Sequence, residues 1–541
     1  MRASRRDGLI LFFLALAVRL SAAWLLTGPT YMDTAYYAVG ARQLAGGAGF
    51  DEPFLWHYLD DPAGLPHPGF LYWMPFPSLL AAPLATLIPG SFFALQLPFA
   101  VLSALFPLVA YRLAWKITDR RRSARLAGVL TIFSGFFFPY WTLPETFTPF
   151  AVFGSVALWL VGCETQGAGD NRRREGWLAH LLAGLLVGLA HLTRADGVLL
   201  LPVVALGPLI SSPTRNKQQA TSDEPRSSRL VVGYWSLVIG YWLLVILGYL
   251  LVMGPWFLRN LALIGAPLSP AGTKTLWLRV YDDLFCYGCD LSLSSYVAWG
   301  WGNILHSKLN ALWINFQRLL AEDGLIFLLP FILVGFYRLR RRPVFILSSV
   351  YLLLAYLLHS VAFTFPGPRG GFFHATAAVL PFLFTAGAEG LEVAVRWAGR
   401  RRRWNLRQAQ AVFATATTVG SVILSVYVMA MHLPAWRDAG AVYRDIAAWL
   451  DAQHGPDAPT VMVGNPPSFH YYSGVPAVVV PNGGVQTVLD VCERYGVDYL
   501  VLDSNRPDPL DALYEGRVSH PRLAQAVTFE DGRVVVWRVG Q

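Results

Sequence analysis

Residues 231–253 read VVGYWSLVIGYWLLVILGYLLVM, an apolar run without one charged side chain. A helix of about 20 such residues is long enough to cross a hydrocarbon core of ~30 Å. Similar runs recur between residue 9 and residue 431. The pattern predicts an α-helical polytopic membrane protein.

The composition supports the same class. Hydrophobic residues make up 55% of the 541-residue chain and charged residues only 14%, against about 25% charged in soluble proteins. A soluble enzyme could not cover that much apolar surface. The first run, 9–26, follows three arginines but ends without a small-x-small cleavage site, so we interpret it as a retained first helix. A soluble cytosolic enzyme and a single-span anchored protein are both excluded.

About eleven membrane-spanning helices are predicted. Their approximate ranges are 9–27, 92–115, 124–141, 147–163, 177–193, 197–212, 231–253, 324–338, 344–361, 372–389 and 409–431.

Basic residues are concentrated in alternate connectors, which sets a predicted orientation. The formal net charge is +9. The N-terminus and the connectors near 112–125, 164–176, 212–230, 338–342 and 390–408 hold 26 of the 43 Lys and Arg. This positive-inside pattern predicts a cytoplasmic N-terminus and an extracytoplasmic C-terminus. It explains the basic composition better than nucleic-acid binding does. The predominance of arginine over lysine suggests a bacterial plasma membrane.

Two segments decide the span count. Residues 71–90 are apolar but contain four prolines, so we expect a helix lying at the outer interface. The stretch 177–212 is interrupted at Arg194, Asp196 and Gly197, which favours two short spans joined there. Both interpretations keep the arginine-rich connectors on one side of the membrane.

After residue 431 the composition becomes polar. AVYRDIAAWLDAQ has the pattern of an amphipathic helix. TVMVG, AVVV and DYLVL are typical of short buried strands, and VTFEDGRVVVWRV is typical of a hairpin. The chain therefore divides into a transmembrane domain, 1–431, with long outer loops at 28–91 and 254–323, and a small extracytoplasmic α/β domain, 432–541.

The first outer loop contains the leading catalytic candidate. It reads YMDTAYYAVGARQLAGGAGF at 31–50, and Asp33 begins a short amphipathic helix beside the membrane surface. A carboxylate in that position suits a general base, although Asp is also a common helix N-cap. Tyr36 and Tyr37 on the same helix are candidates for a cavity wall.

Four motifs carry a resemblance to a known family. Besides D-x-x-x-Y…A-x-x-L-x-x-G-x-G-F in the first loop, they are HPGFLYWMPF at 67–76, LTRADGVLLLP at 192–202 and GPWFLRNLALIGAPLSP at 254–270. In this order they resemble the GT-C membrane glycosyltransferases, in the branch of the protein O-mannosyltransferases and the aminoarabinose transferase of lipid A. The resemblance implies an inverting hexosyl- or pentosyltransferase that uses a polyprenyl-phosphate sugar on the outer membrane face.

The resemblance also implies residue roles. Asp33 matches the family's catalytic base, and Glu145 stands where the family has a second outer-loop acid. His67 and Arg259 stand where relatives place basic groups near the lipid phosphate. The chain departs from the family pattern at Thr34, where many relatives have Glu, and at Gly69, which replaces a proline.

Fixed cations near a departing phosphate lower the barrier to transfer. The candidates at the outer boundary are Arg194, Arg259, Lys274 and Arg369, each of which could instead extend to the lipid headgroups. Arg259 and Arg369 are the leading candidates for phosphate contacts, because both lie in outer segments that contain Pro and Gly (GPWFLRN and FPGPRGG). Arg19 falls inside the first span and is expected to face an internal cavity.

Other candidates carry less information. Cys286 and Cys289 are expected either to form a short-range disulfide or to stay free, since a structural zinc site wants four ligands. The histidines show no metal spacing; His374 is a candidate for the cavity lining or for simple packing. No metal site or cofactor is predicted from these residues, and the question whether the protein needs a divalent metal ion is left open.

A transporter or a flippase for a glycolipid is the alternative function. Transporters place charged groups near the bilayer midplane, whereas most polar candidates here lie on the outer side. The partners expected for the transferase are the lipid-linked donor, membrane lipids, and a lipid, polysaccharide or protein acceptor, with no nucleic acid.

Overall fold

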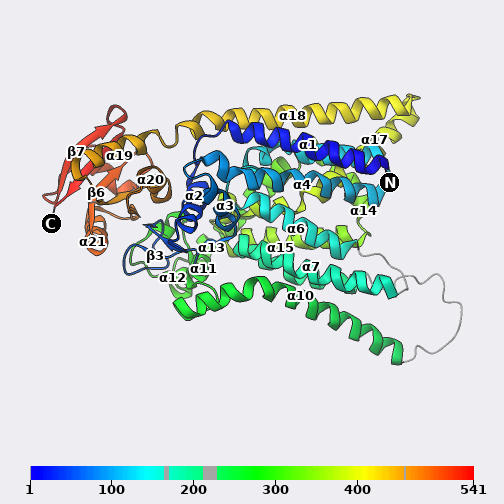
Figure 1. Cartoon of the computed structure of the whole chain (residues 1–541), viewed down its shortest axis with the longest axis horizontal. Coiled ribbons are helices and arrows are strands. Elements are labelled where there is room, and N and C mark those ends of the chain that lie inside the picture. The colour runs from blue at the N-terminus through cyan, green and yellow to red at the C-terminus, as the bar shows by residue number, and fades with distance from the viewer. Residues whose placement is uncertain (1, 164–169, 211–227, 456–457, 541) are drawn as a thin grey trace.

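The computed structural model describes residues 2–163, 170–210, 228–455 and 458–540. Long helices form an elongated bundle, and a small α/β domain sits at one end of it (Figure 1). The N-terminus lies at the opposite end. The chain is therefore a helical membrane protein with a C-terminal sheet domain, as the sequence predicts.

Seven helical segments in the described ranges are long and apolar enough to cross a membrane. They are built on α1 (Arg2–Trp24), α4 (Phe92–Thr118), α7 (Asp170–Thr193), α10 (Ser228–Ile264), α15 (Pro343–Leu357), α17 (Leu380–Arg402) and α18 (Leu406–Asp438).

Four shorter apolar segments accompany them. They are α3 (Phe76–Leu87), α6 (Phe147–Gly162), α14 (Leu329–Leu339) and a broken segment made of η2 (Ala195–Leu199), α8 (Leu200–Ala205) and α9 (Gly207–Ile210).

The predicted span 124–141 differs from the observed structure. The helix α5 (Arg121–Ile132) ends early, and a separate 3₁₀ turn, η1 (Gly135–Tyr140), follows it. Gly135 has φ +60°, a left-handed conformation that ends a helix and that glycine adopts most easily. After Arg125 the range is almost wholly apolar, and its hydrophobicity alone does not reveal such a break.

Short elements between the long helices build the end of the bundle next to the sheet domain. They include α2 (Met32–Ala45), α11 (Pro270–Lys274), η4 (Thr275–Trp277), η5 (Tyr281–Phe285), α12 (Leu293–Ala298), α13 (Trp301–Arg318), η6 (Leu319–Asp323), η7 (Leu358–Ala362), η8 (Gly367–Gly371), α16 (Phe372–Thr376) and η9 (Ala377–Val379). The three π-helical turns η6, η7 and η8 all lie here, and such turns are frequent at functional sites.

The C-terminal region confirms its predicted local structure. Its helices are α19 (Ala441–His454), α20 (Pro466–Ser473) and α21 (Val485–Tyr495), with the short turns η10 (Asp508–Leu510), α22 (Asp511–Tyr514) and η11 (Glu530–Gly532). Its strands are β4 (Thr460–Val463), β5 (Ala477–Val479), β6 (Val497–Leu502), β7 (Leu523–Phe529) and β8 (Val534–Val539).

One strand of this sheet comes from the first loop. The strand order is β2-β5-β4-β6-β8-β7, in which β2 (Phe54–Leu55) pairs in parallel with β5. The Tyr58 hydroxyl donates to the Val479 carbonyl, and Arg42 donates to the Tyr471 carbonyl at 3.1 Å. A small second sheet joins β1 (Asp51–Glu52) to β3 (His67–Pro68). The first loop and the C-terminal domain are thus fastened together.

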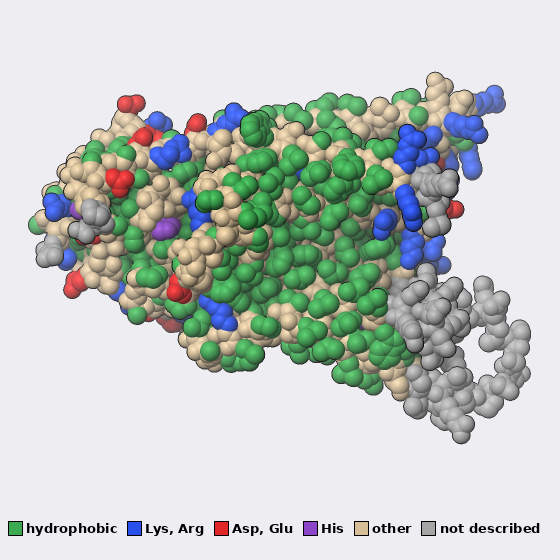
Figure 2. Space-filling view, in the orientation of Figure 1, with side chains coloured by type: hydrophobic (Ala, Val, Ile, Leu, Met, Phe, Trp, Pro, Cys, Tyr) green, Lys and Arg blue, Asp and Glu red, His purple; other side chains and the backbone are tan. Residues whose placement is uncertain are grey.

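Charge is distributed unevenly over the surface. Figure 2 shows a broad apolar belt along the bundle and a concentration of Lys and Arg at the end remote from the sheet domain. We call this the basic end. It holds the connectors 112–125, 338–342 and 390–408, while residues 164–169 and 212–227 of the other two basic connectors lie outside the described residues.

Candidate active site

Three elements bring two acids and a histidine together at the end of the bundle that faces the sheet domain. Asp33 lies in the first turn of α2, Glu145 lies just before α6, and His374 lies in α16. One ligand atom from each lies within 4.8 Å of the other two. His374 Nε2 is 3.5 Å from Glu145 Oε2. The two acids were separate candidates from the sequence, and the structure places them as neighbours in space.

Local packing fixes the histidine. Its ring stacks on Phe147 with the centroids 3.7 Å apart, and Nδ1 lies 2.9 Å from the Gly370 carbonyl, to which it donates. This leaves Nε2 directed at the Glu145 carboxyl. Among the described residues, neither Glu145 oxygen nor this Nε2 has a hydrogen-bond partner of good geometry.

Burial separates the acidities of the two carboxyls. Burial raises the pKa of Asp33 to about 6, and the charge of Arg194 opposes that rise. The Glu145 side chain is 0% exposed, and burial together with the Asp33 charge holds its pKa well above the usual range. Two close carboxyls in a low-dielectric site share one proton. Glu145 therefore holds the shared proton more firmly than Asp33 does.

Tyrosines complete the surroundings of Asp33. The Tyr31 hydroxyl interacts with the Glu145 carboxyl, and Tyr37 interacts electrostatically with both acids. Burial, followed by the Asp33 charge, raises the pKa of Tyr281 to about 12. These phenols therefore stay neutral and can donate hydrogen bonds to a substrate.

Arg194 is held beside the acids by a network. Its Nε and a terminal nitrogen lie 2.9 and 3.0 Å from the two carboxylate oxygens of Asp196. Asp196 also accepts from His359 Nε2 at 2.9 Å. The guanidinium reaches Thr146 Oγ1 at 3.5 Å and the Gly371 carbonyl at 3.3 Å. Both are close in sequence to the two other site residues, Glu145 and His374.

The other candidates lie at different distances from this cluster. The Arg369 guanidinium sits 4.1 Å from the ring centre of Tyr281, the phenol that senses the Asp33 charge. Lys274 donates to the Leu59 carbonyl at 2.6 Å. Arg19 is 1% exposed and donates to the Ile132 carbonyl at 2.8 Å, so a backbone carbonyl and the rings of Phe138 and Trp141 surround it.

Tyr36, His67 and Arg259 belong to a second cluster. It is centred on Glu52, whose Oε1 accepts from the Tyr36 hydroxyl and, at 2.7 Å, from the Phe70 backbone N–H. His67 Nε2 lies 3.0 Å from the Phe54 carbonyl and 3.8 Å from Glu52 Oε2. At its edge, Arg259 donates to the Gly69 carbonyl at 3.0 Å and stacks on Trp256.

Sequence reasoning missed four neighbours of the acids. Tyr31 and Tyr281 lie in loops without a motif of their own. Asp196 was noted only as an interruption of a span, and its partner His359 is 163 positions away. The one sequence signal was the charged pair Arg194 and Asp196 inside an otherwise apolar stretch.

A divalent ion fits the first cluster as far as donor types are concerned. Asp33, Glu145 and His374 offer two carboxylates and an imidazole within 4.8 Å of one another, and the unpartnered Glu145 oxygens are available as donors. The ion would take the place of the proton that the two acids share, since it supplies the same charge compensation.

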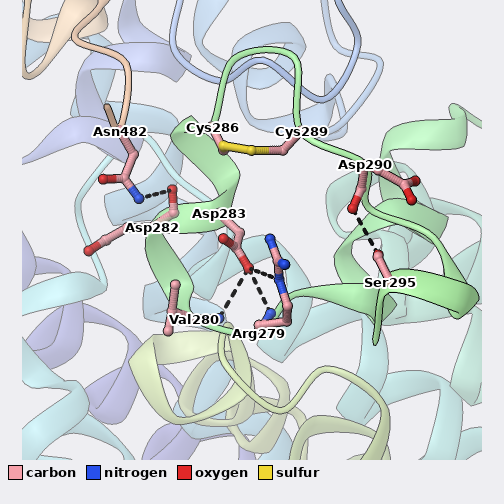
Figure 3. Close-up of a disulfide and its surroundings, with 9 residues drawn as sticks. All are labelled: Arg279, Val280, Asp282, Asp283, Cys286, Cys289, Asp290, Ser295 and Asn482. Carbon is pink, nitrogen blue, oxygen red and sulfur yellow. Dashed lines mark hydrogen bonds and ion pairs between the residues drawn. A yellow bond between two sulfur atoms is a disulfide. The ribbon is translucent and has the colours of Figure 1, made fainter. Parts of the chain in front are cut away.

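The second long loop reaches the sheet domain. Figure 3 shows Cys286 joined to Cys289 in a disulfide, with Asp283 accepting from the Arg279 and Val280 backbone N–H groups. The Asn482 backbone N–H donates to the Phe285 carbonyl at 2.8 Å. The loop that carries Tyr281 is thus anchored to the C-terminal domain.

Comparisons with known proteins identify the fold. A model of the dolichyl-phosphate-mannose-protein mannosyltransferase family matches residues 67–223. The structure of ArnT from Cupriavidus metallidurans in the apo state aligns with a TM-score of 0.59 at 15% identity, over 99% of this chain and 98% of that one. The chain has the GT-C fold.

Further GT-C structures support that assignment. ArnT bound to undecaprenyl phosphate gives a TM-score of 0.57 at 15% identity, over 98% of this chain and 97% of ArnT. The oligosaccharyltransferase AglB from Archaeoglobus fulgidus, in complex with an inhibitory peptide and a dolichol-phosphate, gives 0.52 at 13% identity, over 92% and 69%. No curated protein matches the sequence. The GT-C fold and the apolar helices make this a multi-pass membrane protein.

Proposed function

We propose that the protein is an inverting glycosyltransferase that moves a sugar from a polyprenyl-phosphate donor to an acceptor at the outer face of the membrane. The observation that carries the proposal is the close approach of Asp33 to the buried Glu145, whose pKa burial raises above its usual range, beside the fixed cation Arg194. The family match and the GT-C fold support the class of donor.

The chemistry follows from the acidities. Asp33 takes the proton from the acceptor hydroxyl or amine as that group attacks the anomeric carbon. The bond between this carbon and the phosphate oxygen breaks on the opposite face, and its electron pair leaves with the polyprenyl phosphate. One displacement inverts the anomeric configuration. Glu145, which stays protonated, lets Asp33 carry the only negative charge of the pair.

Cations oppose the charge that grows on the leaving phosphate. Arg369 is proposed as the main contact of the leaving phosphate. Its guanidinium lies over the ring of Tyr281, which interacts with the Asp33 charge. Arg194 is a weaker candidate because it already forms an ion pair with Asp196. Arg259 is a proposed contact for the outer phosphate oxygens. His67 is proposed to act nearby, through the loop that its hydrogen bonds hold in place. Tyr36, Tyr37 and Arg194 would shape the cavity around the sugar.

The orientation of the chain is part of the proposal. Basic connectors gather at the end remote from Asp33, and the positive-inside rule places that end in the cytoplasm. The site and the C-terminal domain, 432–541, would then lie outside a bacterial plasma membrane. A reporter that is active only outside the cytoplasm, fused after the last residue, should be active.

A glycolipid transporter or flippase fits the site less well. The acids lie where short loops and the sheet domain meet the bundle, whereas a transport pathway needs polar groups along the bundle. Arg19 is the buried cation deep in a span, and it donates to a backbone carbonyl.

The experiment uses the purified protein in lipid nanodiscs. Polyprenyl-phosphate donors with radiolabelled sugars are incubated with crude envelope acceptors, and the anomeric configuration of the product is determined by NMR. Transfer with inversion is expected. Retention of configuration would remove the single-displacement mechanism. Absence of transfer for every donor, together with movement of glycolipid across vesicles, would replace the enzyme by the transporter.

A further inference from the structure

A cavity at the basic end is lined by arginines from two connectors. It has a volume of about 420 Å³, and its walls include Arg120 between α4 and α5, four arginines between α14 and α15, and Glu389 of α17. The four are Arg338, Arg340, Arg341 and Arg342. The cavity lies at the end of the bundle remote from the acids of the active site.

The charges in this cavity are unbalanced. Glu389 is the acidic residue in its wall, and it already pairs with Arg120 at 3.1 Å and with Arg396 at 4.0 Å. Among the described residues, none of the four arginines from the second connector forms an ion pair. Guanidinium groups that converge without acids attract an anion with several oxygens, since each offers a fork of donors.

Two helix N-termini add to the positive field. Arg120 is the N-cap of α5 and Arg342 is the N-cap of α15, and neither side chain accepts a hydrogen bond from the first turn. The helices have 12 and 15 residues. Their first backbone N–H groups and their dipoles favour a negative charge at the same place. Arginine at both caps is the reverse of the usual choice, because Ser, Asp and Asn are preferred there.

The surroundings indicate where the anion comes from. Tyr337 in the cavity wall is 66% exposed, and Leu333, one turn earlier on α14, is 61% exposed. This face of α14 is therefore apolar and exposed, and the connector arginines follow it directly in the chain. If the anion is the headgroup of a lipid, its acyl chains can lie along this face beside Leu333. A tyrosine at the boundary is typical of the headgroup level of a bilayer.

We propose that this cavity binds the phosphate headgroup of an anionic phospholipid from the leaflet at the basic end. The phosphodiester lies among Arg338, Arg341 and the two N-caps, and the acyl chains lie along α14.

The α17–α18 connector serves as a comparison, because it is equally basic but is not expected to bind the phosphate. The α17–α18 connector also holds consecutive arginines, at 400–403. Three of them occupy the last turn of α17, where the carbonyl end of the helix dipole already favours a cation. An anion there would meet the wrong end of a helix. The two connectors carry similar charge, but the N-terminus of α18 is capped by the Asn405 side chain, which accepts from the Gln408 backbone N–H, whereas no side chain caps the first turn of α15.

The test compares two double variants that lose the same charge. R338Q/R341Q removes two arginines from the cavity, and R400Q/R402Q removes two from the control connector; both pairs are exposed. Binding of dioleoyl-phosphatidylglycerol to the full chain in detergent is measured by native mass spectrometry, with dioleoyl-phosphatidylcholine as the neutral lipid. We expect the cavity variant to lose at least tenfold in affinity for the anionic lipid and the control variant less than twofold.

Further arms distinguish the source of the anion. Inorganic phosphate at millimolar concentration should not displace the lipid, because it lacks the contacts along α14; full displacement would point to a site for a free anion and overturn the lipid proposal. Equal losses of affinity for the anionic lipid in the two double variants would show that only net charge matters. That result would also overturn the proposed site. The thermal midpoint of both variants in the neutral lipid is measured to confirm that they are folded. If R338Q/R341Q does not fold, R338K/R341K, which keeps the charge but not the fork, should still show a weaker preference for the anionic lipid; an unchanged preference would count against the site.

Discussion

Asp33–Glu145 and Glu52–His67 are two acid clusters at the same end of the bundle, and both contain a buried glutamate. They differ in how that glutamate is satisfied. Glu52 accepts hydrogen bonds from the Tyr36 hydroxyl and the Phe70 backbone. Within the described residues, Glu145 has no partner of good geometry for either oxygen.

The difference separates a structural carboxyl from a chemical one. A satisfied buried acid holds two chain segments in register, and its removal leaves donors without partners. A buried acid without partners costs stability, so the fold retains it where a substrate or a proton completes it. Burial raises the pKa of both Glu52 and Glu145. The two carboxyls therefore differ in their hydrogen bonds and not in the direction of their pKa shift.

The largest expected effect is that of Asp33→Asn. It removes the proposed base and keeps the shape of the side chain, so kcat/KM should fall at least ~100-fold while the thermal midpoint stays nearly constant. The measurement is initial-rate transfer with a short-chain donor. If the variant kept more than about a tenth of the activity, Asp33 would only stabilise the first turn of α2, whose N-cap is Tyr31.

Arg369→Ala should cause the next largest loss of kcat/KM. Loss of a charge-assisted contact to phosphate typically costs about 1.5–3 kcal/mol, which corresponds to roughly 10- to 150-fold in kcat/KM. Arg259→Ala tests the outer phosphate contact in the same range, and Arg259→Lys should recover only part of it. Lys274→Ala is the matched control, since its ammonium donates to the Leu59 carbonyl. A loss for Lys274→Ala as large as that for Arg369→Ala would contradict the assignment.

The pH profile should report the ionisation of Asp33. The base must be ionised, and its pKa is raised to about 6. Activity is therefore expected to be level above that pH and to fall about tenfold per unit below it. The rates are measured between pH 4.5 and 8.5 with stability checked at each point. A profile that is flat down to pH 4.5 would place the base elsewhere.

Glu145→Gln should be milder than Asp33→Asn. Gln keeps a neutral polar group where Glu145 is proposed to be protonated, so we expect a loss of about tenfold or less, with the acidic limb of the pH profile nearly unchanged because no charge beside Asp33 is removed. A chelator should leave wild-type activity unchanged if a proton, rather than a metal ion, balances the two acids. Loss of activity in the chelator and its recovery with added divalent ion would assign the metal instead.

Glu52→Ala should have the smallest effect on catalysis and a clear effect on stability. It leaves the Phe70 N–H and the Tyr36 hydroxyl without their acceptor, at a cost of about 1–3 kcal/mol for each buried group. We expect a lower thermal midpoint and a kcat/KM within about threefold of wild type in the folded protein. A greater loss of activity than that of Glu145→Gln would reverse the roles of the two clusters.

The sequence allowed much of this to be predicted, for identifiable reasons. Long apolar runs revealed most helices, and short apolar runs between turn residues revealed the strands of the C-terminal domain, because both patterns are local. Asp33 and Glu145 were found as separate candidates through a resemblance, and their proximity emerged only from the structure. The partner of Asp196 was not predictable, because a contact over 163 positions leaves no local signal. The short strand Phe54–Leu55 was missed because two residues show no periodicity.

That short strand has a consequence for biosynthesis. The Tyr58 hydroxyl and its acceptor at Val479 are 421 positions apart, and translation proceeds at about 5–20 residues per second. The loop next to Asp33 must therefore wait roughly 20–80 s, with its strand edge uncovered, before the last part of the chain emerges to complete the sheet. A nascent chain interrupted before residue 477 would insert its helices and still lack a finished catalytic loop.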